Sequence, residues 1–374
     1  MNWSWIIAGI ALIAVGLLDL FLSALNYDES GMLTLRLQAL QWHVLRGVLL
    51  RLPARWRGFG RAQVIGLQIL LDLVVWVALV TIGWGFVYFG LMYDHSFQFS
   101  GSHIGRSMDY AIYFSIAQFS TVGATSMTPQ TTLLRVLGVL ETLIGLGIVT
   151  LAISFLISVF QTITYLRTLA SDLHYPAPGA SDPVRLLAVF FPQGQPTGLS
   201  DYLGRLHQNL GAYYAGLQLH HTAYYYQSRS DYISLPYVFQ ALGGVVGALR
   251  WGVPEGNAVA HEPLLTVLAN ELAACLSFLN GQRHWQSEEP PAPQSYQAFA
   301  ERYDNGSAAG DPWLDRFLAL DREMRRLLCA EQPADAHEAY ERYAAWLPPA
   351  YRVERSAARM AQHLGYDLAT TGVR

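Results

Sequence analysis

Three long apolar runs constrain the fold of this chain more than any other feature. They cover Trp3 to Leu25, Val64 to Tyr93 and Leu133 to Leu166. Each run can cross a bilayer core of about 30 Å as a helix that rises about 1.5 Å per residue. With 52% hydrophobic and 14% charged residues, the whole chain is too apolar for an ordinary soluble protein. We therefore expect an all-α membrane protein with a soluble part.

Arginines between the first two runs predict the orientation of the chain. This connection, residues 27–63, carries Asp28 and Glu29 against a larger set of arginines, Arg36, Arg46, Arg51, Arg55, Arg57 and Arg61. Such an excess places a loop in the cytoplasm. The N-terminus is then outside and the C-terminus cytoplasmic, in a bacterial inner membrane. A cleaved signal peptide is the rival for the first run, but no basic residue precedes it.

Two polar features of these segments need protein partners. Asp19 lies inside the first run, and a carboxylate there is expected to face protein or the headgroup region. Met32 to Leu52 predicts a helix within the connection. Because its polar positions do not share one face, lying at the membrane interface and packing on other helices remain equal alternatives.

A short segment between the second and third runs differs from all others. It reads SMDYAIYFSIAQFSTVGATSMTP from Ser107 to Pro129. Asp109 to Phe119 predicts a helix too short to cross a bilayer, capped by Ser107 or Asp109. The segment resembles the pore helix and filter of the potassium-channel superfamily. The residues that carry the resemblance are Tyr113, Phe114, Ser115, Thr121, Val122, Gly123, Met127, Thr128 and Pro129.

The resemblance implies a tetrameric pore-loop channel, assembled from four identical chains because each chain has one pore loop. The implied pore domain, 64–170, comprises an outer helix 64–93, a pore helix 107–120, a filter 121–126 and an inner helix 133–168. Residues 1–26 are then an additional N-terminal transmembrane helix. In the family, filter carbonyls replace the water around monovalent cations such as potassium or sodium. The filter positions here are Thr121, Val122, Gly123, Ala124, Thr125 and Ser126.

The outer half of this filter departs from the family sequence TVGYGD. Ala124 stands where the family has a tyrosine, and Thr125 stands where the family has a glycine that takes a positive φ. TVGAT is similar to the TIGET filter of cyclic-nucleotide-gated channels, which discriminate little between sodium and potassium. Weak monovalent selectivity is the main hypothesis. The alternatives are a potassium-selective channel with an unusual filter and a non-conducting, membrane-anchored interaction or signalling protein.

The inner helix contains further candidate residues. Glu141 is expected behind the filter, bonded to the hydroxyls of Ser115 or Ser120, rather than as an ion ligand. Gly145 suits either a gating hinge or close helix packing, two equal alternatives. A helically spaced set is predicted to line the cavity: Leu146, Val149, Ile153, Ile157 and Gln161.

The remaining chain predicts a proline-rich linker, 171–200, and a cytoplasmic helical domain, 201–374. No nucleotide-binding, catalytic or metal motif is recognisable, and no basic stripe suggests nucleic acid. We therefore expect no enzyme activity, no cofactor and no metal site, while a gating ligand cannot be identified. HHTAYYY at 220–226 favours a packed aromatic seam over a ligand site. Cys275 and Cys329 suggest reduced thiols.

Overall fold

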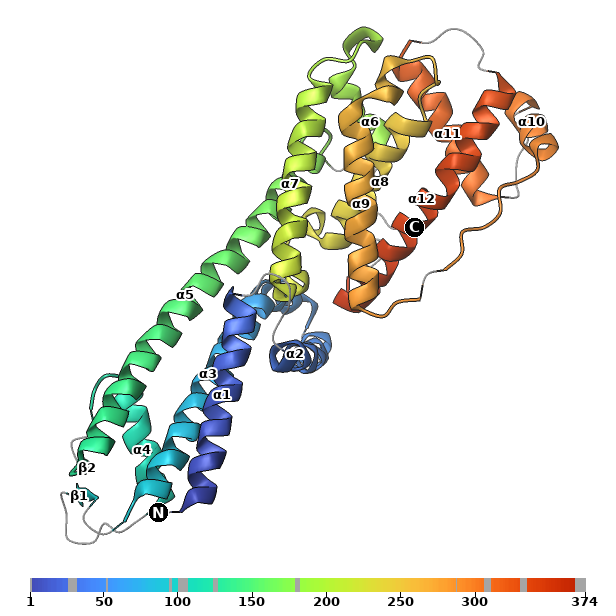
Figure 1. The fold of residues 1–374 in the computed structure, drawn as a ribbon. Helices are drawn as coiled ribbons and strands as arrows, with labels where there is room; N and C mark the ends of the chain where they lie inside the picture. Colours follow the sequence, from blue (N-terminus) through green and yellow to red (C-terminus); the bar gives the residue numbers. More distant parts are fainter. Residues whose placement is uncertain are drawn as a thin grey trace. The chain divides into compact units, whose positions relative to one another are not determined.

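The structure, a computed structural model, divides the chain into two units (Figure 1). It describes residues 2–25, 32–51, 53–93, 96–99, 107–123, 127–178, 182–286, 288–305, 311–329 and 335–366. Unit 1 consists of Met1–Gln161 with Gly216–Tyr226, and unit 2 of Thr162–Ala215 with Gln227–Arg374. In this described part, the regular structure is α-helix and short 3-10 turns, apart from one pair of three-residue strands. The predicted all-α fold class is confirmed.

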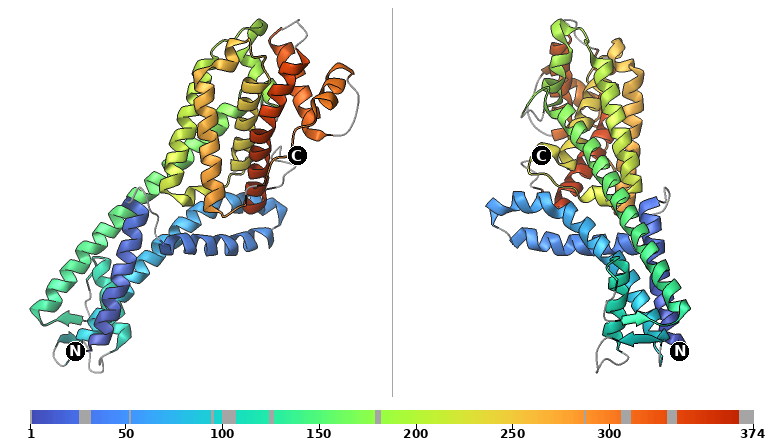
Figure 2. Two further views of the ribbon diagram at one scale, coloured as in Figure 1. Left: turned by 45° about the vertical axis from the view of Figure 1, so that its right-hand side comes forward. Right: turned by 90° about the vertical axis from the view of Figure 1, so that its left-hand side faces the viewer.

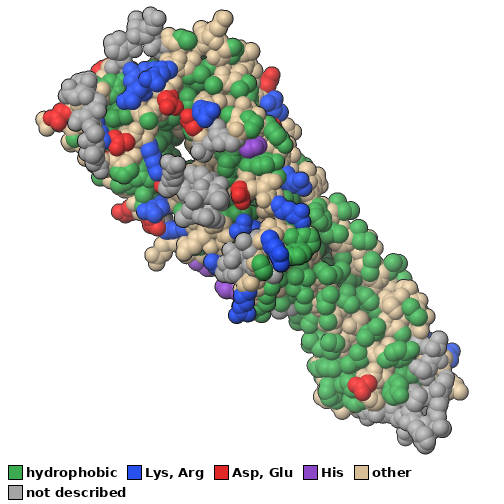
Figure 3. Space-filling view, turned by 180° about the vertical axis from the view of Figure 1, so that it is seen from behind, with side chains coloured by type: hydrophobic (Ala, Val, Ile, Leu, Met, Phe, Trp, Pro, Cys, Tyr) green, Lys and Arg blue, Asp and Glu red, His purple; other side chains and the backbone are tan. Residues whose placement is uncertain are grey.

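Long apolar helices form most of unit 1. They are α1 (Trp3–Leu25), α3 (Ala54–Leu91) and α5 (Thr132–His174), which continues into unit 2. All three are long and apolar enough to cross a membrane, and so is a less apolar helix of unit 2, α9 (Pro263–Gln282). Hydrophobic side chains predominate on the visible surface of the long apolar helices (Figure 3). The chain is therefore a multi-pass membrane protein.

Two of these helices extend beyond their predicted limits. The outer helix was expected at 64–93, but α3 begins ten residues earlier at Ala54, directly after Pro53. No proline interrupts the arginine-bearing segment that follows, so the helix continues through it. The inner helix was expected at 133–168, but α5 continues to His174 because the next proline is Pro176.

Glycines bring α1 and α3 into backbone contact. A Cβ atom on Gly9 would lie 2.4 Å from the carbonyl oxygen of Gly83, which leaves no room for a side chain. Small residues allow such contacts between membrane helices, where van der Waals packing supplies much of the attraction. Asp19 is buried in this unit and accepts hydrogen bonds from Trp76 Nε1 at 2.9 Å and from the backbone N–H of Thr34 at 3.2 Å. Asp19 therefore faces protein.

Helix α2 (Met32–Arg51) packs on α3 through its polar residues. Gln38 Nε2 lies 3.0 Å and Gln41 Nε2 2.9 Å from the two carboxylate oxygens of Asp72, and all three side chains are buried. Leu40 and Val44 remain exposed on α2. Of the two alternatives for this helix, packing is present, and the exposed apolar residues leave an interfacial position open as well.

One segment of unit 1 comes from a distant part of the sequence. Gly216–Tyr226 contains the end of α7 (Leu199–Leu219) and the 3-10 turn η3 (His221–Tyr225), and it belongs with the membrane helices. Its Thr222 hydroxyl accepts a hydrogen bond of 2.5 Å from Gln38 Nε2. The rings of Trp42 and Tyr225 lie 5.4 Å apart. The predicted cytoplasmic domain 201–374 is thus interrupted, because these buried side chains complete the core of unit 1.

His220 of this segment packs among the helices of unit 1. His220 Nε2 lies 2.7 Å from the hydroxyl of Ser158, and its ring packs edge-on against Phe155. Among the residues that the structure describes, no group of three or more histidines, cysteines or carboxylates could hold a metal ion. Tyr224 and Tyr225 are buried, as expected for a packed aromatic seam.

Unit 2 is a helical assembly (Figure 2). Its α-helices beyond α5, α7 and α9 are α6 (Pro183–Leu187), α8 (Leu235–Trp251), α10 (Tyr296–Asn305), α11 (Pro312–Leu327) and α12 (Ala336–Leu364). Its 3-10 turns are η1 (Ala188–Phe190), η2 (Pro192–Gly194), η4 (Asp231–Ile233) and η5 (Ala258–His261). The predicted linker 171–200 therefore contains ordered turns, including α6, which begins at Pro183 after the capping side chain of Asp182.

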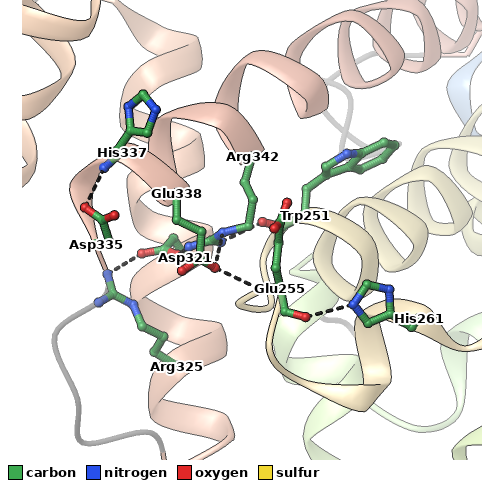
Figure 4. Close-up of polar contacts among 9 residues, drawn as sticks. All are labelled: Trp251, Glu255, His261, Asp321, Arg325, Asp335, His337, Glu338 and Arg342. Carbon is green, nitrogen blue, oxygen red and sulfur yellow. Dashed lines mark hydrogen bonds and ion pairs between the residues drawn. The ribbon is translucent and has the colours of Figure 1, made fainter.

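A buried ion-pair cluster connects α8, α11 and α12 (Figure 4). Arg342 donates to Asp321 Oδ1 at 2.7 Å and to the carbonyl oxygen of Trp251 at 2.8 Å. Arg325 also pairs with Asp321, which is fully buried. Beside it, an aromatic cluster fills the core: Phe299, Phe317, Tyr343 and Trp346. A buried charge of this kind requires its partners because its desolvation is costly.

We expect Asp321→Asn to destabilise the protein by about 3 kcal/mol, because it removes the buried carboxylate that Arg325 and Arg342 share. Asp315→Asn, on the same helix, removes an exposed pair with Arg302 and should cost less than about 1 kcal/mol. Chemical unfolding of the full-length protein in detergent, followed by circular dichroism, measures both. Equal losses in the two variants would contradict the role of the cluster.

Candidate ion-conduction site

The short helix α4 (Met108–Phe119) occupies the predicted pore-helix position. Its 12 residues span about 18 Å, too little to cross a bilayer. The Ser107 hydroxyl accepts a hydrogen bond from the Asp109 N–H at 3.3 Å, and Asp109 lies in the positive first turn. The helix ends at the capping residue Ser120. It therefore begins and ends within the membrane unit.

Close contacts fix α4 against α3. A Cβ atom on Gly85 would lie 2.8 Å from the side chain of Ile112, so glycine permits the two helices to touch. The Phe114 ring packs edge-on against Tyr88, with centroids 4.8 Å apart, and against Phe97 at 5.3 Å. These contacts bury one face of the pore helix.

A two-stranded pair joins the segments on either side of the pore loop. Strand β1 (Phe97–Phe99) runs antiparallel to β2 (Met127–Pro129), with Phe97 opposite Pro129. The backbone N–H of Gln130 also donates to the carbonyl oxygen of Ser96 at 3.0 Å. The chain that enters the pore helix and the chain that leaves the filter are therefore held together.

Glu141 anchors the pore helix from behind. Its side chain is fully buried, with Ser115 Oγ 2.5 Å from one carboxylate oxygen and Tyr88 Oη 2.7 Å from the other. Ser115 Oγ also lies 2.8 Å from the carbonyl oxygen of Thr81. Charge-assisted hydrogen bonds of this kind are strong in a medium that excludes water. One carboxylate thus connects helices α3, α4 and α5.

The predicted contact between Glu141 and Ser115 is present, whereas the alternative contact with Ser120 is not. Ser120 lies at the end of α4, and its hydroxyl donates to the carbonyl oxygen of Ala117 at 3.2 Å. Ser120 therefore supports the turn into the filter. Position 115, in contrast, lies on the buried face of the helix.

Sequence reasoning missed Tyr88 as the second partner of Glu141. Aromatic residues near the end of a spanning helix are typical of the membrane interface. Tyr93 is exposed as this rule predicts, but Trp84 and Tyr88 are buried. The available signal was the tyrosine hydroxyl itself, which needs a partner when it is buried in an apolar helix. Nothing in the sequence gives the distance between positions 88 and 141.

The described part of the predicted filter, Thr121 to Gly123, forms a turn at the end of α4. The N–H of Thr121 donates to Gln118 O at 3.0 Å, and that of Gly123 donates to Ala117 O at 2.9 Å. Thr121 has a φ of 61° and Gly123 one of 75°. The first value is rare for a β-branched residue and indicates backbone strain at this site. Val122 is 79% exposed in the single chain.

The predicted outer filter residues, Ala124, Thr125 and Ser126, lie outside the described residues. Their role in selectivity stays a prediction. The described residues on either side, Gly123 and Met127, bound a gap of three positions.

The end of the pore helix rests on α5 at Gly145. A Cβ atom there would lie 3.0 Å from the carbonyl oxygen and 3.1 Å from the ring of Phe119. Thr142 Oγ1 also lies 3.2 Å from Gln118 O. These contacts support the packing alternative for Gly145. Helix α5 is continuous through this position, and a hinge stays a prediction.

The predicted cavity residues share an exposed side of α5 in the single chain. Their exposure is 60% for Leu146, 47% for Val149, 54% for Ile153 and 62% for Ile157, and Gln161 is also exposed. Other apolar residues of α5, including Val139, Leu143 and Phe160, are exposed as well. The apolar face is therefore wider than the predicted set, and cavity lining stays a prediction.

A double-mutant cycle tests the anchor at Glu141. Tyr88→Phe and Glu141→Gln should show a coupling of about 1–2 kcal/mol because they share a buried hydrogen bond. Tyr93→Phe with Glu141→Gln serves as the control and should be additive within about 0.5 kcal/mol. Unfolding by dodecyl sulfate in mixed micelles measures the free energies. Additivity in the Tyr88 cycle would exclude the anchor.

Two neighbouring glycines provide a matched test of packing. Gly145→Ala should destabilise the protein by about 1–3 kcal/mol because its methyl group meets Phe119. Nothing lies within 4 Å of a Cβ on Gly147, so Gly147→Ala should be neutral or stabilise by up to about 1 kcal/mol. The same unfolding measurement applies. A loss at Gly147 as large as at Gly145 would argue against the contact.

Comparison with known proteins places this geometry in a family. Residues 74–162 match the family model described as an ion channel, a range that contains α4, the predicted filter and most of α5. A curated protein of Bacillus subtilis (strain 168), the uncharacterized membrane protein YdjJ, is 28% identical over 178 residues. That alignment covers 46% of this chain and 49% of YdjJ, so the chain spans about half the length of this relative. No solved structure matches the chain.

The matched range starts within α3 and ends within α5, and thus includes the glutamate anchor and the described filter turn. The resemblance to the potassium-channel superfamily is confirmed over this range. Residues 74–162 of this chain are therefore similar to the ion-channel domains that this family model describes.

Proposed function

We propose that four copies of this chain form a weakly selective monovalent cation channel in a bacterial inner membrane. The observation that carries the proposal is the pore helix, anchored by Glu141 and Tyr88, with the Thr121-Val122-Gly123 turn directly at its C-terminal end. The N-terminus is outside and the C-terminus cytoplasmic, in agreement with the arginines of the connection. The function requires no catalytic step and no resident cofactor.

Assembly of four chains follows from the incomplete pore of a single chain. One chain supplies one pore helix and one filter segment, while a pore-loop filter needs rings of carbonyl oxygens. Val122, Leu146 and Ile157 each expose more than half of their surface in the single chain. Burial of such side chains between copies, or along a central cavity, would remove this apolar surface from water.

Four pore helices could stabilise a cation through their dipoles. The C-terminal end of an α-helix carries a partial negative charge, and α4 ends at Phe119, immediately before the filter. Filter carbonyls then replace the hydration shell of the passing ion. The mainly aliphatic exposed face of α5 suits a cavity that gates by dewetting. No permeant ion other than potassium or sodium is needed for this mechanism.

Weak selectivity follows from the outer filter sequence. Thr125 is poorly suited to the positive φ of the family's second glycine, and Ala124 lacks the tyrosine that braces the family's outer carbonyl rings. Fewer well-placed rings discriminate less between potassium and sodium. Ala124 also stands where cyclic-nucleotide-gated channels have glutamate, so strong block by calcium is not part of the proposal.

We expect bi-ionic reversal potentials with sodium and potassium to lie close to zero for the reconstituted wild type. Ala124→Tyr with Thr125→Gly restores both family residues and should shift the reversal potential toward that of potassium. Thr128→Ser, just outside the filter, is the control and should leave it unchanged.

Other results distinguish the alternatives. A large wild-type shift toward potassium would favour a potassium-selective channel with an unusual filter. Absence of ion flux from reconstituted protein at several voltages and pH values would favour a non-conducting, membrane-anchored interaction or signalling protein.

A further inference from the structure

A cavity of about 550 Å³ lies in unit 2 among helices α8, α9 and α12. Cavities of about 300–1,000 Å³ are typical of small-molecule sites. One wall is apolar and includes Val246, Leu272, Ala273 and Leu276, while Trp346 adds an aromatic surface. The cavity belongs to unit 2 alone and is separate from the ion-conduction site.

The lining of this cavity is also strongly basic. It contains four arginines, Arg250, Arg352, Arg355 and Arg359, and one carboxylate, that of Glu288. Three of them, Arg352, Arg355 and Arg359, are spaced by three and four residues and therefore share one side of α12. Arginine is well suited to binding carboxylates because its planar guanidinium group donates two parallel hydrogen bonds.

Glu288 shows how a carboxylate binds to these arginines. Arg359 Nη2 lies 2.5 Å from one of its oxygens, while Arg355 Nε lies 3.1 Å and Tyr351 Oη 3.0 Å from the other. These donors hold the pKa of the Glu288 carboxyl below its usual value. Two guanidinium groups and one hydroxyl thus form a ready receptor for a carboxylate.

The segment that carries Glu288 is not fixed in this position by regular secondary structure. Residues 288–295 have no regular structure and contain Pro290, Pro291 and Pro293. The Glu288 side chain is 42% exposed, and pairs at the surface contribute little because water screens them. A ligand carboxylate that also buries an apolar body against α8 and α9 gains a contribution that Glu288 does not supply.

We propose that this cavity binds a small organic carboxylate with an apolar body, whose carboxylate displaces Glu288 from Arg355 and Arg359. The apolar body lies against Val246, Leu272 and Leu276. The site goes beyond ion conduction and does not depend on the selectivity of the pore.

Equilibrium dialysis of radiolabelled phenylacetate and hexanoate against the full-length protein in lipid nanodiscs tests this proposal. The wild type should bind at least one probe, and Glu288→Gln should bind it about threefold or more tightly because an internal competitor is lost. Arg359→Gln should weaken binding about tenfold or more. Tyr351→Phe, which keeps the packing of the ring, should weaken it about threefold.

Exposed residues elsewhere in unit 2 provide matched controls. Arg322→Gln and Glu301→Gln carry the same substitutions away from the cavity and should leave binding within about twofold of the wild type. Thermal unfolding verifies that each variant is folded.

Three outcomes would overturn the proposal. The first is that neither probe binds to the wild type or to Glu288→Gln. The second is unchanged binding in both Arg359→Gln and Tyr351→Phe. The third is displacement of the labelled probe by inorganic phosphate, or by the neutral analogue 2-phenylethanol, as effectively as by the unlabelled carboxylate. That result would show that the carboxylate is not recognised.

Discussion

Carboxylates buried among apolar helices organise the membrane unit. A polar group that cannot reach water in a bilayer must find its partners within the protein. Three acidic residues meet this requirement with donors from other helices: Asp19, Asp72 and Glu141. Because each accepts at least two hydrogen bonds, each also restricts the relative positions of the elements that supply the donors. Apolar packing alone would permit helices to slide more freely.

The carboxylate nearest the pore has the most specific consequence. Glu141 lies one helical turn before Gly145, so the polar anchor and the close contact with Phe119 act on the same stretch of α5. The anchor holds the pore helix at its middle, through Ser115, and the glycine contact holds it at its end. The strained turn at Thr121 therefore follows a helix that is held at two points, its middle and its end.

The sequence predicted the helices better than it predicted the contacts between them. Apolar length located α1, and the family resemblance located the pore helix. The cost of a carboxylate within an apolar helix predicted a partner for Glu141, either Ser115 or Ser120. Helix limits at Ala54 and His174 were missed because the amphipathic ends of long helices lack the apolar signal of their centres. The role of Tyr88 was missed because hydrophobicity does not distinguish a tyrosine at the membrane interface from one with a buried partner. The fold of residues 216–226 into unit 1 required long-range contacts that no local pattern encodes.

The packing of residues 216–226 in unit 1 affects the order in which the protein folds during synthesis. Gln38, Trp42 and Ser158 precede their partners Thr222, Tyr225 and His220 by more than 60 residues. A ribosome must therefore translate α7 and η3 after α5 before the core of unit 1 can close. Until then, the amide of Gln38 and the ring of Trp42 lack these partners. A chain truncated directly after the inner helix would contain every element of the pore and still lack part of the core that supports it.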